Sequence, residues 1–275
     1  MVNDVTNLII NPSTKRNVEH FLEFPTHAVM FYGQSGLGVD TIAMDTARKL
    51  AGNQILLITP NEKGKITIDI IRDSIIRIIS NIQNSPFAVL IKEADTMTIS
   101  AQNSLLKNLE EPVKNVHFIL SAHKQESLLP TVRSRVQMIE IMPVPTNETT
   151  KLLSEAKITA DKRTKIAFLA SGKPAETIRL LNDEDYYRDM AISAENAKKF
   201  ISGKTYDKLV IISGIKKRDE ATNFVQIVAN LLLFLSNSRE IPRLSENLIV
   251  IDEVLNNLRQ NGNVRTQLTY LATNI

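Results

Sequence analysis

Five short apolar runs, separated by helical patterns, occupy the first half of this 275-residue chain. Each run has five or six residues, the usual length of a buried strand. Apolar runs that alternate with helices are typical of a parallel sheet covered by helices. The sequence therefore predicts an α/β domain with a parallel five-stranded sheet, whose expected strands are Ala28–Tyr32, Gln54–Thr59, Phe87–Ile91, Val116–Leu120 and Val136–Ile141.

Two segments between these runs carry the clearest helical patterns. In Thr67–Gln83, isoleucines recur at steps of three and four residues, so one face of a helix would be apolar and pack on the sheet. Ile99–Glu110 carries a similar stripe of leucines. We expect that helix to end before Pro112, because proline disfavours helix in the residue that precedes it.

A domain boundary is expected where Pro143 and Pro145 follow the fifth apolar run, because prolines interrupt regular structure. From Glu148 onward the patterns are helical only, with breaks at Ser171–Gly172, Asn182–Glu184, Ser213–Gly214 and Pro242. The predicted organisation is an α/β domain over residues 1–145, a small all-α domain over 146–182 and a longer all-α domain over 183–275.

A glycine-rich loop of sequence GQSGLGVD follows the first apolar run and precedes a helical pattern. That order gathers backbone N–H groups and the positive end of a helix dipole where a phosphate could bind. The spacing of Gly33 and Gly38, with Gly36 between them, fits the nucleotide-binding P-loop. Val39 and Asp40 stand where a working loop needs a lysine and a magnesium-binding hydroxyl. The three glycines are therefore interpreted as a vestigial P-loop without nucleotide, although a plain turn is an alternative.

The third apolar run ends in the charged segment Lys92, Glu93, Ala94 and Asp95. In P-loop ATPases a strand in this place ends with an aspartate that orients magnesium, followed by a glutamate that activates water. Lys92 stands at the metal position, where its positive charge would oppose Mg²⁺. A simple solvated loop is the alternative interpretation.

Composition excludes several classes of site. Cysteine is absent, so disulfides and thiolate metal sites are excluded and a reducing, cytoplasmic location is expected. The four histidines lack the spacing of a zinc-binding helix, so no metal site is expected. Neither a signal peptide nor an 18-residue apolar run occurs, so no membrane association is expected. The net charge of +3 permits a polyanionic partner without requiring one.

The segment Ala101–Pro112, AQNSLLKNLEEP, resembles the AQNALLKTLEEP signature of the AAA+ subunits of bacterial DNA polymerase III clamp loaders. The resemblance covers the whole α/β domain, and Val116–Val136 is similar to the family's strand, loop and Ser-Arg-Cys stretch. The remainder resembles the family's helical lid and collar domains more loosely. The resemblance implies an AAA+ domain, then a lid, then a collar that assembles with related subunits.

The resemblance also implies that Arg135, with Ser134, is an arginine finger that reaches the ATP of a neighbouring subunit. Ser121–His123 stands where ATPase members show Ala-Thr-Thr, and Pro174 stands where they carry a sensor arginine. Four altered nucleotide elements beside a retained finger resemble the delta-prime type of subunit rather than the gamma/tau ATPases. The family's zinc-binding cysteines are lacking, so neither zinc nor another cofactor is expected, and ATP is expected only in the neighbour.

The expected function is therefore that of a non-hydrolysing, delta-prime-like clamp-loader subunit in DNA replication, which is not an enzyme on its own. Its implied partners are the gamma/tau ATPase subunits, the delta subunit and, through the assembly, the sliding clamp (beta) and primer-template DNA. Two alternatives stay open: a divergent active ATPase that uses Asp40, Glu93 or Asp95, and a DNA-binding AAA+ adaptor outside the polymerase. The apolar stripe Phe224–Phe234 is interpreted either as plain core or as a surface that packs on partner collars.

Overall fold

The computed structural model describes residues 9–81, 85–236, 241 and 243–275. It divides into two compact units, which we call the α/β unit (Met1–Ala156 with Gly172–Ile178) and the helical unit (Lys157–Ser171 with Arg179–Ile275). The segment predicted as the lid, 146–182, contributes to both units, and the boundaries at 145/146 and 182/183 stay predictions. Gln83 and Pro242, which were named above, and Ile82, which belongs to the predicted helix Thr67–Gln83, lie outside the described residues.

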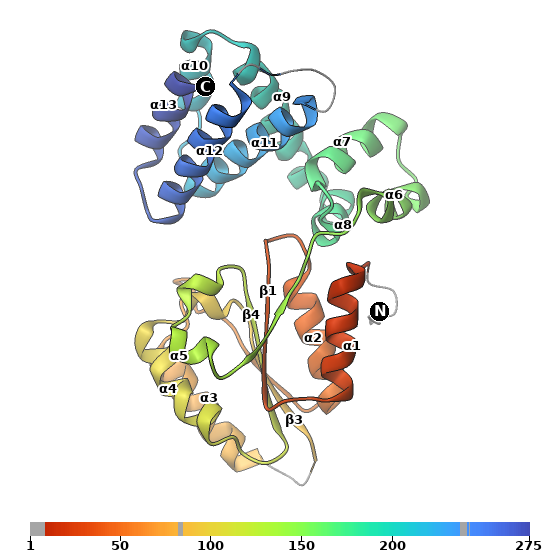
Figure 1. The fold of residues 1–275 in the computed structure, drawn as a ribbon, viewed down its shortest axis with the longest axis vertical. Coiled ribbons are helices and arrows are strands. Elements are labelled where there is room, and N and C mark those ends of the chain that lie inside the picture. Colours follow the sequence, from red (N-terminus) through yellow and green to blue (C-terminus); the bar gives the residue numbers. More distant parts are fainter. Residues whose placement is uncertain (1–8, 82–84, 237–240, 242) are drawn as a thin grey trace. The chain divides into compact units, whose positions relative to one another are not determined.

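Within the described residues, five parallel strands form the sheet of the α/β unit, in the spatial order β2-β3-β4-β1-β5 (Figure 1). The α/β fold and its parallel five-stranded sheet are thus confirmed. The register sets Phe31 of β1 beside Ser121 of β4, so the carboxyl ends of these two strands lie at one edge of the sheet. The strands are β1 (Ala28–Tyr32), β2 (Ile55–Ile58), β3 (Phe87–Ile91), β4 (Val116–Ala122) and β5 (Gln137–Glu140).

Helices cover both faces of the sheet and make it the middle of three layers (Figure 1). Phe21 and Ile42 are buried on the face covered by α1 and α2. Leu105 and Leu109 are buried on the other face, which is covered by α3, α4 and α5. These helices are α1 (Pro12–Glu23), α2 (Val39–Ala51), α3 (Ile68–Asn81), α4 (Ile99–Glu110) and α5 (Pro130–Arg133).

The two helices predicted from apolar stripes are present as α3 and α4. Ile71 of α3 is buried against the sheet, whereas nothing is described for the side chains of Ile75, Ile78 and Ile79. α4 begins where the Thr98 side chain accepts a hydrogen bond from the backbone N–H of Ala101, a common N-terminal cap. It ends at Glu110, before Pro112. The local sequence thus determines both ends of α4.

The C-terminal half is helical throughout its described residues, as predicted. The stripe of α11 is mostly core, because Phe224, Val228 and Leu232 are each 1% exposed or less, whereas Phe234 is 58% exposed. The rings of Phe200 and Phe224 meet edge to face, with centroids 5.4 Å apart. The helices are α6 (Thr146–Glu155), α7 (Ala160–Ala170), α8 (Pro174–Asn182), α9 (Glu184–Ser202), α10 (Thr205–Ser213), α11 (Arg218–Ser236), α12 (Leu244–Arg259) and α13 (Val264–Asn274).

Among the described residues, none of the helices has both the length and the apolar character that crossing a bilayer requires.

Candidate functional site

The glycine loop connects β1 to α2 at the edge of the sheet where β3 and β4 also end. Gly36 and Gly38 have φ angles of +86° and +84°, a backbone conformation that glycine adopts without the strain of a Cβ atom. Gly38 is the residue that precedes the first turn of α2. The predicted order of strand, loop and helix is therefore confirmed.

Asp40, in the first turn of α2, accepts a hydrogen bond from the hydroxyl of Ser121 at the end of β4. Ser121 is 0% exposed, and its Oγ also accepts a hydrogen bond from the backbone N–H of Glu93 at 3.3 Å. Ser121 thus links the start of α2 to the segment that follows β3. The sequence identified both Asp40 and Ser121 as departures from the ATPase pattern, but it did not reveal that they are partners.

A second set of hydrogen bonds fixes the beginning of the loop. The backbone N–H of His123 donates to Asp95 Oδ1 at 3.1 Å, and the Nδ1 atom of His123 lies 3.2 Å from the Gly33 carbonyl oxygen. Because a carbonyl oxygen only accepts, Nδ1 carries the proton in this contact. The backbone N–H of Gly33 donates to the Ala122 carbonyl at 3.2 Å. The loop, the β3 end and the β4 end therefore form one connected network.

The first turn of α8 packs against the outer side of the glycine loop. The backbone N–H of Glu176 donates to the Gly36 carbonyl at 3.1 Å. A Cβ atom added to Gly36 would lie 3.0 Å from the Cβ of Glu176 and 3.3 Å from the Cδ of Lys173. Burial lowers the pKa of Lys173 from its ordinary value, and the negative charge of Glu176 partly offsets this effect. No local pattern indicates these contacts, because they depend on how α8 folds back onto the loop.

Substitution of Gly36 tests whether the loop needs a glycine there to pack closely against α8. We expect Gly36→Ala to lower the free energy of unfolding of the chain, without nucleotide, by about 1–3 kcal/mol more than Gly64→Ala does. Gly64 is a matched control, because its φ is also positive, at +67°, but a Cβ there meets nothing within 4 Å. Urea unfolding measures both variants. Equal losses would contradict a packing role for Gly36.

A cavity of about 340 Å³ lies beside the glycine loop in the α/β unit. A volume of this size is in the range of small-molecule sites. Its walls are largely apolar, and they include Ile10, Leu37, Ile42, Leu152 and Ile178. The cavity could accommodate an apolar ring, but its lining brings no charged group to such a ligand.

The structure places Arg135 and Ser134 directly after α5, apart from the hydrogen-bond network of the glycine loop. Arg135 Nη2 lies 2.6 Å from Glu110 Oε1 at the end of α4. Arg135 Nη1 donates to the Thr131 carbonyl at 2.9 Å and to Ser134 Oγ at 3.3 Å. The Arg135 side chain is 34% exposed. It is therefore held by its own chain while remaining accessible to another molecule.

Gln102 of α4 holds the segment that leads into α5. It is 1% exposed, and its Nε2 donates to the carbonyls of Met97 and Ser127 at 3.2 and 3.1 Å. Its Oε1 accepts a hydrogen bond from the backbone N–H of Leu129 at 2.7 Å. A buried amide with both ends bonded fixes its surroundings. α4 thus determines where α5, and with it Arg135, lies.

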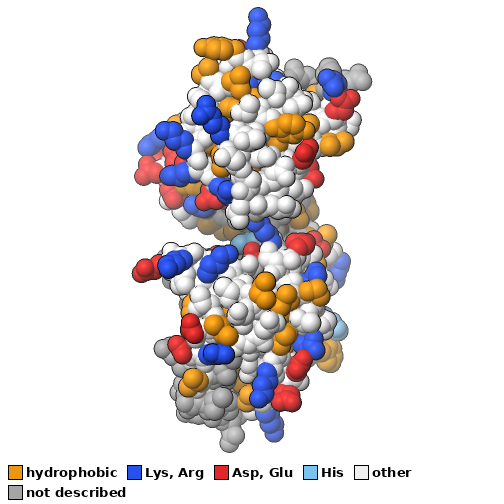
Figure 2. All heavy atoms as spheres, turned by 90° about the vertical axis from the view of Figure 1, so that its left-hand side faces the viewer, with side chains coloured by type: hydrophobic (Ala, Val, Ile, Leu, Met, Phe, Trp, Pro, Cys, Tyr) orange, Lys and Arg blue, Asp and Glu red, His pale blue; other side chains and the backbone are white. Residues whose placement is uncertain are grey.

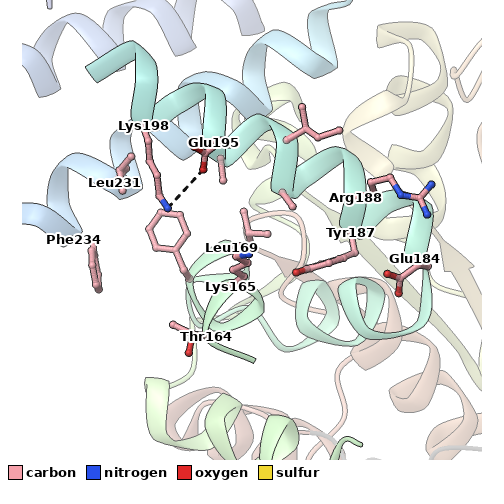
Figure 3. A pocket seen from close by; sticks show the side chains of 14 residues that line it. Thr164, Lys165, Leu169, Glu184, Tyr187, Arg188, Glu195, Lys198, Leu231 and Phe234 are labelled. Carbon is pink, nitrogen blue, oxygen red and sulfur yellow. Dashed lines mark ion pairs between the residues drawn. The ribbon is translucent and has the colours of Figure 1, made fainter. Parts of the chain in front are cut away.

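A separate cavity of about 620 Å³ occurs in the helical unit, between α7, α9 and α11 (Figure 3). Leu169, Leu231 and Phe234 contribute to its apolar lining. Lys198, which also lines it, lies 4.0 Å from Glu195 of the same helix (Figure 3). Among the described residues, no three histidine, aspartate or glutamate side chains gather as a metal site would require. The cavity is an apolar groove with ion pairs at its rim.

Part of the chain is similar to known proteins. The family described as DNA polymerase III, delta subunit, matches residues 51–145. The chain is similar to Replication factor C small subunit 2 of Pyrobaculum islandicum, with 34% identity over 42% of this chain and 38% of that protein. It is also similar to the DNA polymerase III subunit delta' of Yersinia pestis, with 41% identity over 31% of this chain and 26% of that protein.

A solved structure shares the fold over most of its length. A DNA polymerase III, gamma subunit-related protein from Thermotoga maritima has a TM-score of 0.55 and 18% identity, covering 93% of this chain and 97% of that one. By contrast, each of the two sequence relatives is matched over less than two thirds of its own length. The matched residues 51–145 contain α4 and Arg135. In residues 51–145 and in its parallel five-stranded sheet, the chain is thus similar to clamp-loader proteins of the AAA+ type.

Proposed function

We propose that the chain is a delta-prime-like subunit of the DNA polymerase III clamp loader, which does not hydrolyse ATP but presents Arg135 to ATP bound by a neighbouring subunit. In this role it assembles with gamma/tau-like ATPase subunits and a delta-like subunit. The assembly then acts on a sliding clamp and on primer-template DNA. The chain would be a noncatalytic part of the polymerase, and ATP would bind only to the neighbour.

The observation that carries the proposal is the hydrogen bond between Asp40 and Ser121. A working loop needs a hydroxyl on Mg²⁺ and a lysine on the phosphates where this chain has Asp40 and Val39. A carboxylate there opposes a phosphate: two unit charges about 4 Å apart repel by about 4 kcal/mol at an effective dielectric constant of about 20. The bond to Ser121 also occupies an Asp40 oxygen that a metal ion would need.

Lys92, at the end of β3, supports the same proposal. Its backbone N–H donates to the Ile58 carbonyl at 2.9 Å, which fixes it at the end of β3. A positive charge at this position adds to the positive charge of Mg²⁺ instead of balancing it. The end of β3 would therefore disfavour the metal ion, while Asp40 in the loop would disfavour the phosphates.

The network of the glycine loop supports a rigid, stationary role. Gly33, Asp40, Glu93 and Asp95 are all joined through the end of β4, and α8 holds Gly36 from outside. A segment held by hydrogen bonds at several points has less freedom to open around a ligand. The chain would thus offer its neighbour a fixed surface, and ATP binding in the neighbour would supply the movement.

The test is to mix the isolated chain with Mg²⁺ and ATP. We expect no turnover and no rise in melting temperature, because a ligand stabilises a folded protein only when it binds. The cognate ATPase subunit, measured in parallel, is the positive control for both readouts. Hydrolysis by the isolated chain at the rate of that subunit would refute the proposal in favour of a divergent active ATPase.

Lys173 favours a second candidate function, the binding of a nucleotide without hydrolysis. It lies beside Gly36, so its ammonium is a cation close to the loop although the loop itself has none. A melting temperature that rises with ATP in the native chain, but not in Lys173→Ala, would establish this function. Absent turnover in the same samples would separate it from an active ATPase.

A DNA-binding adaptor outside the polymerase receives less support, because the net charge of the chain is only +3. Figure 2 shows the face of the α/β unit that carries α3, α4 and α5, where Lys and Arg side chains of the described residues alternate with Asp and Glu. A protein that holds DNA on its own usually gathers positive charge on one surface. Salt-sensitive binding of the isolated chain to primed DNA, without affinity for ATPase subunits, would be the evidence for an adaptor.

A further inference from the structure

The ion pair between Arg135 and Glu110 assigns a role to a second residue, and this inference rests on the proposed function of Arg135. We propose that Glu110 is a positioning residue, which holds the Arg135 side chain in the orientation that a neighbour's phosphate requires. Glu110 would not touch the ATP. It would act only through the guanidinium of Arg135.

Three contacts hold the guanidinium. Glu110 lies 2.6 Å from Nη2, and Nη1 donates to Thr131 and Ser134. A guanidinium has five N–H groups in a planar fork, so these contacts leave about two N–H groups for an incoming phosphate. Thr131 and Ser134 both contact Nη1. Of these three contacts, only the one with Glu110 holds Nη2, at the other end of the guanidinium.

α4 brings Glu110 to this place. Through Gln102 the helix holds the segment before α5, and through Glu110, its last residue, it holds Arg135 after α5. Both attachments lie on one rigid helix, and rigid elements position functional groups more precisely than loops do. The structure thus supports Arg135 from both sides of α5.

Stability does not explain the ion pair well. The Glu110 side chain is 50% exposed and that of Arg135 34% exposed, and ion pairs exposed to this extent contribute little to folding. We expect Glu110→Gln to leave the melting temperature within about 2 °C of the native value. The substitution would instead leave the long Arg135 side chain less ordered, and this would slow the chemical step of ATP hydrolysis in the neighbouring subunit.

The test is a double-mutant cycle in the reconstituted assembly with the cognate ATPase subunit, clamp and primed DNA. We expect Glu110→Gln to lower the neighbour's kcat roughly 3- to 10-fold, with its KM for ATP unchanged, because an interaction made only in the transition state affects kcat. Glu111→Gln is the matched control: it removes the same charge one residue away, and its side chain makes no ion pair among the described residues. It should leave kcat unchanged.

The double-mutant cycle distinguishes a failure of the proposed role of Glu110 from a failure of the proposed function of Arg135. In an Arg135→Ala background, Glu110→Gln should have no further effect, because residues that act as one unit are not additive. A further loss in that background, a rise in kcat, or equal effects of Glu110→Gln and Glu111→Gln would each overturn the role of Glu110. If Arg135→Ala itself changes nothing, the proposed function fails, and the role of Glu110 fails with it.

Discussion

An assembly that contains Arg135→Ala should hydrolyse ATP about 10³-fold more slowly than the native assembly when clamp and primed DNA are present, because arginine fingers contribute at least about this factor in other nucleotidases. The charge of Arg135 would stabilise negative charge that develops on the transferred phosphoryl group of the neighbour's ATP. Steady-state hydrolysis by the reconstituted assembly measures the loss. Size-exclusion chromatography should show that assembly itself is intact, since Arg135 makes its contacts within α4 and α5.

Two further variants test whether the loss is specific to the guanidinium of Arg135. Arg135→Lys retains the charge but not the planar fork, so it should restore only part of the activity. Arg188→Ala is a matched control, because Arg188 is also an ion-paired arginine, 3.0 Å from Asp185, but lies in the helical unit. It should leave hydrolysis unchanged. Normal hydrolysis with Arg135→Ala would remove the proposed role of this residue.

The largest expected loss of stability comes from Phe224→Ala in the helical unit. Phe224 is 1% exposed and packs edge to face on Phe200, so its removal should lower the free energy of unfolding by about 3–5 kcal/mol. Phe234→Ala, on the same helix, is the control. Phe234 is 58% exposed and contacts Phe168 at a ring distance of 5.8 Å, so we expect a loss below about 1 kcal/mol.

Urea unfolding of both variants distinguishes the two interpretations of the α11 stripe. Equal losses would contradict the assignment of Phe224 to the core and Phe234 to the surface. If Phe234 also packs on a partner collar, Phe234→Ala should weaken assembly while the chain alone stays stable. Assembly that is unaffected by Phe234→Ala would leave α11 as an element of the internal core only.

The bounds of the strands could be predicted closely, because each strand coincides with an apolar run in the sequence. β1 and β3 have the predicted bounds, while β2 and β5 are one residue shorter at each end and β4 is two residues longer. The apolar runs of the inner strands β1, β3 and β4 are buried on both faces of the sheet, so pattern and burial agree there, whereas the edge strands β2 and β5 are partly exposed. α1 was not predicted, although Asn11 accepts a hydrogen bond from the Ser13 N–H and Pro12 begins the helix, both of which are recognisable start signals.

The candidate site could be predicted only as single positions. The glycine loop follows from local spacing, and Asp40 follows from its place in the loop. The pairing of Asp40 with Ser121 depends on β4 lying next to β1, and an order of strands that differs from chain order has no local signal. The ion pair of Glu110 with Arg135 has no local signal either, because it joins α4 to the residue after α5.

The hydrogen bond between Asp40 and Ser121 also restricts how the sequence can change over evolutionary time. A threonine at position 40, as in a working P-loop, ends one bond shorter than aspartate and cannot keep the same bond to Ser121. The hydroxyl of Ser121 is fully buried, so losing its acceptor would cost about 1–3 kcal/mol. A change of Asp40 to threonine would therefore first lower the stability of the protein, so the Asp40–Ser121 pair disfavours a return to the P-loop residue.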